Sequence, residues 1–94
     1  MQERAVYLQE QRQWLFQRLS KHALIEKVFP SDSNFLLVRC HEADTVFAAL
    51  RDQGVLVRDF SAARGTERCL RISLGTASEN QRIMQILDSV AVSV

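Results

Sequence analysis

The feature that most constrains the fold is a pair of short aliphatic runs, each with one arginine, joined by a polar segment. The first run spans residues 54–59 and the second spans residues 69–76. Side chains of a β-strand point alternately to its two faces. In the second run the core-facing set is then Leu70, Ile72 and Leu74, and the opposite set is Cys69, Arg71 and Ser73. The alternation predicts a sheet with one buried face and one face that carries Arg71.

Two arginines are the candidate functional groups of these runs. Arg71 is a guanidinium on a rigid strand, and a planar fork of five donors suits a carboxylate or a phosphate. Arg58 ends the first run and could project into the same space. The pairing register cannot be read from the sequence, so it stays open whether the two share a face. The alternative is a solvated or structural role, with Asp59 and Glu67 as candidate ion-pair partners.

Composition limits the class of protein. The chain has 94 residues, of which 47% are hydrophobic and 24% charged, as in one soluble globular domain or one part of a larger protein. The net charge of +1 argues against a nucleic-acid partner, which requires a concentrated basic surface. No apolar run approaches the roughly 20 residues of a membrane-spanning helix, so we expect no membrane partner.

The two cysteines indicate the compartment. Cys40 and Cys69 both fall inside predicted strands, where a free cysteine behaves as a small buried hydrophobe. Two cysteines do not establish a disulfide framework, so we expect a reducing, cytoplasmic setting. The adjacent Cys40 and His41 would face opposite sides of a strand, which makes them a poor nucleophile–base pair. No metal-ligand spacing is present, and we expect no metal.

The hydrophobic periodicity predicts seven elements. Helices are expected over residues 2–21, 41–53 and from Ser78 to about Val90, and strands over 24–29, 35–40, 55–59 and 69–74. Gly54 is placed as the left-handed residue that ends the second helix. The pattern Ser78-x-x-Gln81 is interpreted as the capping box of the last helix. The order α-β-β-α-β-β-α predicts an α+β fold, with a mainly antiparallel four-stranded sheet and helices packed on one face.

The first predicted helix has an unusually broad apolar surface. Leu8, Leu15 and Leu19 form one stripe, and Tyr7 and Trp14 form a second ridge beside it. A small domain with helices on one side needs less than this. Two interpretations stay open: a surface helix whose Arg12 extends its stem along the apolar side chains, or a helix held on two sides, by its own domain and by another part of a longer chain.

The segment from Pro30 to Asn34 has the composition of a turn between two strands. Asn34 has two possible roles there. Its side chain could cap the turn, or its amide could be presented to a ligand.

Three motifs in order resemble a known family. Residues 54–59 and 70–76 are similar to the C-terminal small domain of fold-type I, pyridoxal-phosphate-dependent aminotransferases, and most closely to the histidinol-phosphate aminotransferases among them. The stretch from Ser31 to Val38 resembles the Ser-x-x-Asn-aromatic-aliphatic strand entry of that family. The resemblance covers nearly the whole chain.

The resemblance implies a function for the site residues. Arg71 corresponds to an arginine that binds the 2-oxoglutarate carboxylate, Arg58 to one that holds the phosphate end of the substrate, and Asn34 to an asparagine near the active site. It implies that residues 1–94 form the C-terminal small domain of a larger enzyme of histidine biosynthesis. The catalytic lysine and most contacts to pyridoxal 5'-phosphate would then belong to a large domain of the same polypeptide, which this chain lacks.

The resemblance also sets the expected partners and the alternatives. The parent enzyme would transfer an amino group from histidinol phosphate to 2-oxoglutarate as a homodimer, and this chain alone would be inactive. A related enzyme acting on a phosphorylated amino acid, of the threonine-phosphate decarboxylase type, would need the same arginines. A stand-alone α+β module that binds a small molecule is compatible with the fold, as is a domain without ligand function.

Overall fold

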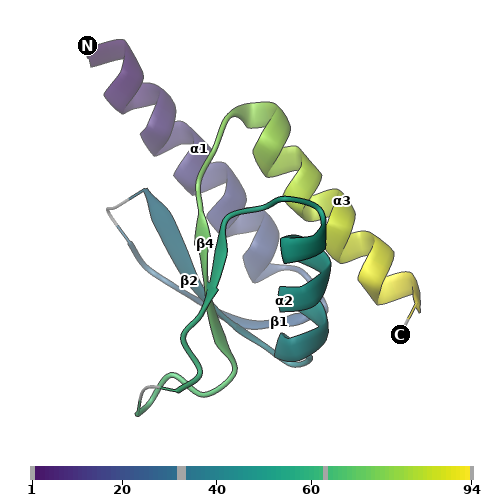
Figure 1. The fold of residues 1–94 in the computed structure, drawn as a ribbon. Helices are drawn as coiled ribbons and strands as arrows, with labels where there is room; N and C mark the ends of the chain where they lie inside the picture. Colours follow the sequence, from purple (N-terminus) through teal and green to yellow (C-terminus); the bar gives the residue numbers. More distant parts are fainter. Residues whose placement is uncertain (1, 32–33, 63, 94) are drawn as a thin grey trace.

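The computed structural model describes residues 2–31, 34–62 and 64–93. Its elements follow the expected order. They are α1 (Gln2–Ser20), β1 (Ile25–Phe29), β2 (Phe35–Cys40), α2 (Ala43–Asp52), β3 (Val57–Asp59), β4 (Cys69–Ser73) and α3 (Ala77–Ser93). The three helices lie together on one side of the sheet, with α1 and α3 side by side (Figure 1). The α+β fold predicted from the sequence is confirmed.

The four strands form one antiparallel sheet in the order β1-β2-β4-β3. Strand β4 therefore lies between β2 and β3, with Leu36 and Val57 both paired with Ile72. Each hairpin places its two strands next to each other, and the contact between β2 and β4 joins the hairpins. The register fixes which side chains face the helices, since residues directly opposite in a pair point to the same face.

A single core lies between the sheet and the helices. The core side chains of β2 alternate along the strand, and those of the helices repeat at helical spacing, as expected. The fully buried residues of this cluster are Leu15 and Leu19 of α1, Leu36, Val38 and Cys40 of β2, Val46 and Leu50 of α2, Ile72 of β4 and Leu87 of α3. Both cysteines are free and buried, as predicted.

Helix α2 ends as the sequence predicts, and this ending delays the next strand. Gly54 has φ +82°, the Gly54 N–H donates to the Arg51 carbonyl (3.0 Å), and the Val55 N–H donates to the Leu50 carbonyl (3.0 Å). These two bonds form a Schellman motif. Because the Val55 N–H is used by the helix end, β3 begins at Val57 rather than at the expected position 55.

Helix α3 begins at a different capping box from the one predicted. The Thr76 Oγ1 accepts from the Glu79 N–H (3.3 Å), and the Glu79 carboxylate accepts from the Thr76 N–H (2.8 Å). The motif is therefore Thr76-x-x-Glu79, and the assignment to Ser78-x-x-Gln81 was wrong. Both patterns fit the capping-box consensus, and only the three-dimensional start of the helix distinguishes them.

The two ridges predicted for α1 have different environments. Trp14 packs against the core and carries the Arg18 guanidinium over its ring at 5.3 Å, so it is not part of an exposed ridge. Val6 and Tyr7, about two turns nearer the N-terminus than Trp14, are 50% and 41% exposed. The Tyr7 hydroxyl accepts a hydrogen bond from the Ala77 N–H (2.6 Å), which ties α1 to the start of α3.

The end of α2 gives the first prediction. Nothing lies within 4 Å of a Cβ built on Gly54, so a substitution there is opposed by the positive φ alone. We expect Gly54→Ala to lower the free energy of unfolding by roughly 1–2 kcal/mol. Gly54→Asn should cost less, because asparagine tolerates the left-handed region. Urea denaturation of both variants tests this, and equal losses for Ala and Asn would contradict a conformational cause.

Candidate functional site

Arg58 and Arg71 are directly paired across β3 and β4. Residues paired in this way point to the same face, so the register answers the question that the sequence left open. The next pair along, Val57 with Ile72, faces the core, and the two arginines therefore lie on the sheet face that the helices leave uncovered. Two arginines thus share one open face of the sheet, an arrangement that would suit an anionic ligand.

The open face combines cations with apolar side chains. Arg71 is paired with Leu37 on its other side, and Leu37 with Phe29, so one row crosses the whole sheet from Phe29 to Arg58. The neighbouring rows contain Phe35 with Ser73, and Lys27 with Arg39 and Cys69. The strands contribute four cations and no carboxylate to these rows. The strand residues of these rows therefore carry a positive net charge, although the chain as a whole carries only +1.

The carboxylates considered as structural partners of the arginines are engaged elsewhere. Asp59 accepts hydrogen bonds from the Ser61 hydroxyl (2.6 Å) and the Ser61 N–H (2.8 Å), which hold the pKa of its carboxyl below the usual value. Glu67 accepts from the Gly65 N–H (3.3 Å). In the described part of the chain, no ion pair or hydrogen bond joins the Arg71 guanidinium to either carboxylate.

Arg71 is instead bounded by aromatic rings. Its guanidinium carbon lies 5.0 Å from the centroid of the Phe35 ring and 5.5 Å from that of Phe60. Phe35 begins β2 and Phe60 directly follows β3, so the rings approach from the two strands that flank β4. Contacts with rings leave N–H donors of the guanidinium edge available for an anion.

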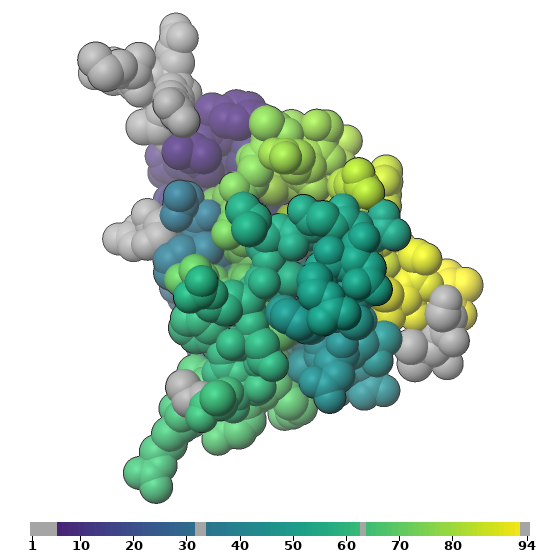
Figure 2. Space-filling model, viewed as in Figure 1, coloured from purple at the N-terminus to yellow at the C-terminus, as the bar shows by residue number. Residues whose placement is uncertain are grey.

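The connection from β3 to β4 is fastened to the sheet at its base. It extends from the body of the molecule as a protruding arm (Figure 2). The Arg39 guanidinium donates to the Gly65 carbonyl (2.7 Å) and the Glu67 carbonyl (3.1 Å), and Thr66 donates from its hydroxyl to the Phe60 carbonyl (2.5 Å). The Phe60 N–H donates to the Cys69 carbonyl (3.0 Å). These bonds fix the arm's base beside the arginine pair.

Asn34 lies at the edge of the same region. It is exposed, and its carbonyl accepts the Leu74 N–H at 2.9 Å, just beyond the pairing of Phe35 with Ser73. The turn residues Asp32 and Ser33 lie outside the described residues. The backbone of Asn34 thus closes one end of the β2–β4 ladder, and the predicted roles of its side chain stay predictions.

A second charged group clasps the two hairpins together. Arg68 has φ +61° and donates to the Glu26 carboxylate (2.7 Å) and the Cys40 carbonyl (3.0 Å). The hydrogen bond from Arg68 holds the pKa of the Glu26 carboxyl below its usual value. Burial, assisted by the neighbouring Cys69, raises the pKa of the Cys40 thiol to about 12. That thiol is therefore protonated at neutral pH and unsuited to act as a nucleophile.

The helix side contains a polar residue that sequence reasoning missed. Asn80 is fully buried; its side chain donates to the Gln11 amide oxygen (2.9 Å) and the Gly75 carbonyl (3.1 Å), and accepts the Gly75 N–H (3.0 Å). The signal was present, since Asn80, Ile83 and Leu87 share one helical stripe. Asn80 fixes the turn between β4 and α3, where a Cβ on Gly75 would collide with Glu79.

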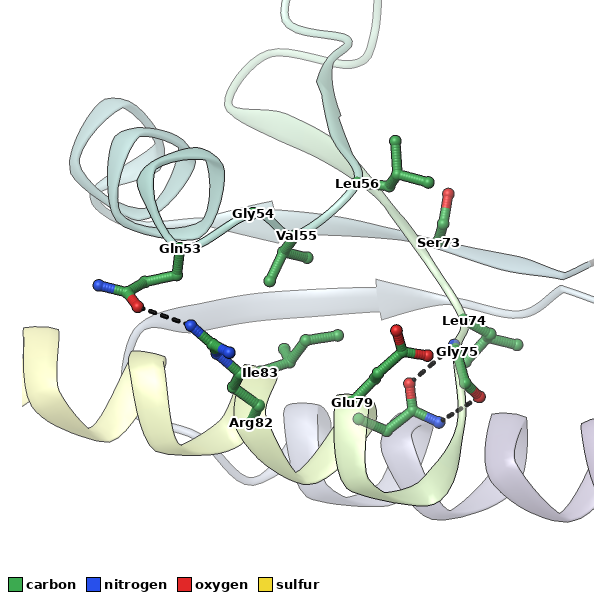
Figure 3. A pocket seen from close by; sticks show the side chains of 11 residues that line it. Gln53, Gly54, Val55, Leu56, Ser73, Leu74, Gly75, Glu79, Arg82 and Ile83 are labelled. Carbon is green, nitrogen blue, oxygen red and sulfur yellow. Dashed lines mark hydrogen bonds between the residues drawn. The ribbon is translucent and has the colours of Figure 1, made fainter.

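A cleft of about 210 Å³ lies between this turn and the connection from α2 to β3 (Figure 3). Two charged side chains line it, Glu79 and Arg82. Glu79 accepts from the Thr76 backbone, and Arg82 donates to the Gln53 side chain (2.9 Å). Both charges serve the structure, so the arginine pair on the open face remains the stronger candidate site.

The described residues contain no group of three or more His, Cys, Asp or Glu side chains that could hold a metal ion. Of the helices in the described ranges, none combines the length and apolar character that a membrane crossing requires.

Comparison with known proteins identifies the family. The model of the family described as aminotransferase class I and II matches residues 1–87, most of the chain. The chain belongs to the aminotransferase class I and II family. Its sequence is 41% identical over 90 residues to the histidinol-phosphate aminotransferase of Serratia proteamaculans, covering 96% of this chain and 25% of that protein. It is 40% identical over 91 residues to that of Yersinia pseudotuberculosis, covering 97% and 24%.

Solved structures agree with this family. The histidinol-phosphate aminotransferase from Clostridium acetobutylicum superimposes with a TM-score of 0.83 over 95% of this chain and 28% of that one, at 18% identity, which shows a shared fold. A decarboxylase from Sulfurospirillum multivorans gives 0.73 over 86% and 24%, at 28% identity. The chain spans about a quarter of the length of these aminotransferases.

The aminotransferase class I and II family implies pyridoxal 5'-phosphate as cofactor. The group is held through a lysine in an enclosed site. The two lysines of this chain do not fit that role. Lys21 is exposed after the end of α1, and Lys27 is exposed on β1 with its ammonium 5.0 Å from the Phe29 ring. The described residues of this aminotransferase domain thus include no lysine suited to hold the cofactor.

The arginine pair predicts an unusual response to charge removal. Like charges directly opposite in an antiparallel pair destabilise the sheet, within a range of roughly 0.2–1 kcal/mol. We expect Arg58→Gln to raise the free energy of unfolding at low salt, by about half a kcal/mol, and the gain to shrink in 1 M salt as screening grows. Urea denaturation at two salt concentrations measures this. The exposed loop residue Arg64, changed to Gln, is the control, and no gain for Arg58→Gln at low salt would contradict the repulsion.

The Glu26–Arg68 clasp predicts an acid sensitivity. A carboxyl whose pKa is lowered by folding stabilises the protein above its unfolded pKa, and this contribution is lost as the pH falls through the folded value. For Glu26 the loss should begin near its ordinary pKa of 4.5 and continue below it. We expect Glu26→Gln to lower Tm at pH 7 and to show a smaller further drop at pH 3 than the unmodified chain. Glu10→Gln, an exposed change on α1, should keep the full drop; equal drops for all three proteins would refute the clasp.

Proposed function

We propose that this chain is the C-terminal small domain of a pyridoxal-phosphate-dependent aminotransferase that converts histidinol phosphate in histidine biosynthesis. The names of the similar aminotransferases support this substrate, and the chain aligns with about a quarter of their length. The remaining part of such an enzyme would be a large domain of the same polypeptide that carries the catalytic lysine. When bound there, pyridoxal 5'-phosphate supplies the carbon electrophile and electron sink for amino transfer.

The observation that carries the proposal is the pairing of Arg58 with Arg71 on the open face. Arg71 binds the carboxylate of 2-oxoglutarate through its planar fork, which fixes orientation as well as charge. Arg58 holds the phosphate end of histidinol phosphate, and Asn34 contributes an amide at the rim. In this assignment the chain binds and orients the substrate, while the large domain performs the chemistry.

The arrangement in the cell follows from the same proposal. The enzyme works as a homodimer in the cytoplasm, and the 94-residue domain by itself is inactive. Two free, buried thiols are consistent with a reducing compartment. The exposed Val6 and Tyr7 on α1 are consistent with contact to the large domain on that side.

A second candidate is a decarboxylase that acts on a phosphorylated amino acid. The structural similarity to the Sulfurospirillum decarboxylase favours it, since that protein has 28% identity with the chain. A phosphate and a carboxylate on one substrate would occupy the same arginine pair. Incubation of the complete enzyme with each substrate class separates the candidates, because one releases carbon dioxide and the other transfers an amino group to 2-oxoglutarate.

The role of Arg71 is tested in the polypeptide that the whole reading frame encodes. Lysine keeps the charge but loses the bidentate fork. We expect Arg71→Lys to lower kcat/KM for amino transfer at least tenfold, or about 1.4 kcal/mol in transition-state stabilisation. Arg82→Lys, on the helix side, is the matched control and should leave kcat/KM within twofold. Unchanged kinetics for Arg71→Lys would remove Arg71 from the site.

A further inference from the structure

The distribution of phenylalanine on the molecule is uneven. Phe16 and Phe47 pack against the core, as large apolar side chains normally do. Phe29, Phe35 and Phe60 are only half-buried and lie outside that core. On the open face of an antiparallel sheet, polar residues are usual at such positions. Another property of the rings must therefore account for their place beside the cations.

Two of these rings contact the same guanidinium. Phe35 and Phe60 stand on either side of Arg71, with centroids 5.0 and 5.5 Å from the guanidinium carbon. Both distances lie within the range of about 6 Å for a cation–π contact. The third ring, Phe29, has cation–π contacts with Lys27 and Arg39, and among the described residues it has none with Arg71. Phe29 therefore serves as a comparison for Phe35 and Phe60, because it is a ring on the same face without a contact to Arg71.

Arg71 needs such support because of its neighbour. Arg58 lies directly opposite and repels it, so an unrestrained guanidinium would turn away into solvent. A long arginine side chain also loses rotamer freedom when it binds a ligand, which weakens binding. Rings that hold the guanidinium before the ligand arrives reduce this loss.

The backbone that carries the Phe60 ring is held by hydrogen bonds. Its backbone N–H is bonded to Cys69, and its carbonyl accepts from the Thr66 hydroxyl. Arg39 fastens the same connection through the Gly65 and Glu67 carbonyls. Phe35 is fixed as the first residue of β2, paired with Ser73. Both rings are therefore carried by hydrogen-bonded backbone at the sheet surface.

We propose that Phe35 and Phe60 are positioning residues of the anion site, which hold the Arg71 guanidinium flat against the sheet with its N–H edge directed outward. They bind no ligand themselves and act through Arg71. This inference rests on the proposed function of the arginine pair. It adds that the affinity for an anion depends on two phenylalanines that carry no charge.

The test measures the motion of Arg71 by 15N relaxation of its side-chain Nε–H group in the 94-residue chain. We expect a restrained signal in the unmodified protein and a clear fall in order parameter in Phe35→Leu and in Phe60→Leu. Phe29→Leu is the matched control, since it removes a ring from the same face, and should leave Arg71 restrained. Phe35→Tyr restores a ring and should restore the order. An unchanged order parameter in both leucine variants overturns the proposal.

Titration with inorganic phosphate then links this motion to binding. Followed on the Arg71 Nε–H signal, phosphate should bind at least threefold more weakly to Phe35→Leu than to the unmodified chain or Phe29→Leu. Equal phosphate affinities of the unmodified chain, Phe35→Leu and Phe29→Leu overturn the positioning role. This holds even if Arg71→Gln abolishes phosphate binding, since that result would concern Arg71 alone. If phosphate shifts the Nε–H signal of neither arginine in the unmodified chain, the two-arginine site of the proposed function is wrong. The relaxation data alone then show whether the two rings restrain Arg71. Backbone spectra of each variant verify that the fold is kept.

Discussion

The position of β4 between β2 and β3 is the constraint on which the rest of the structure depends. Its register places Ile72 in the core and, one residue away, Arg71 on the open face opposite Arg58. A slip of one residue would exchange the two faces, burying a guanidinium and exposing the core side chains. The hydrophobic pattern that stabilises the fold is therefore the same pattern that assembles the arginine pair.

Much of this could be predicted from the sequence, because the period of the apolar residues decides the elements. The alternation around Arg71 gave its face correctly, and the element order followed from the periodicities. The pairing of Arg58 with Arg71 could not be predicted, since register depends on contacts between strands far apart in the sequence. Asn80 was missed because a buried polar residue is recognised by its partners, and those lie on α1 and the β4–α3 turn.

Polar side chains are hydrogen-bonded on the helix side of the sheet, whereas two like charges are paired on the open side. On the helix side, the buried Asn80 is hydrogen-bonded to Gln11 and Gly75, and Glu79 and Arg82 also form hydrogen bonds within the chain. On the open side, Arg58 and Arg71 are paired, and within the described ranges Arg71 contacts two aromatic rings and forms no ion pair with a carboxylate. The polar side chains on the helix side have hydrogen-bond partners, whereas Arg58 and Arg71 on the open side are paired with each other as like charges.

Such a pair is a cost to stability that folding alone does not explain. Local conflicts of this kind are expected at functional sites, where a protein keeps a strained arrangement because a ligand relieves it. An anion placed between Arg58 and Arg71 converts their repulsion into two attractions. In the proposed site, an anion would therefore bind more strongly the better the free arginines are held together, and rings, which restrain a guanidinium without neutralising it, are suited to that task. A carboxylate in the place of Phe35 would restrain Arg71 equally well, but it would compete with the ligand.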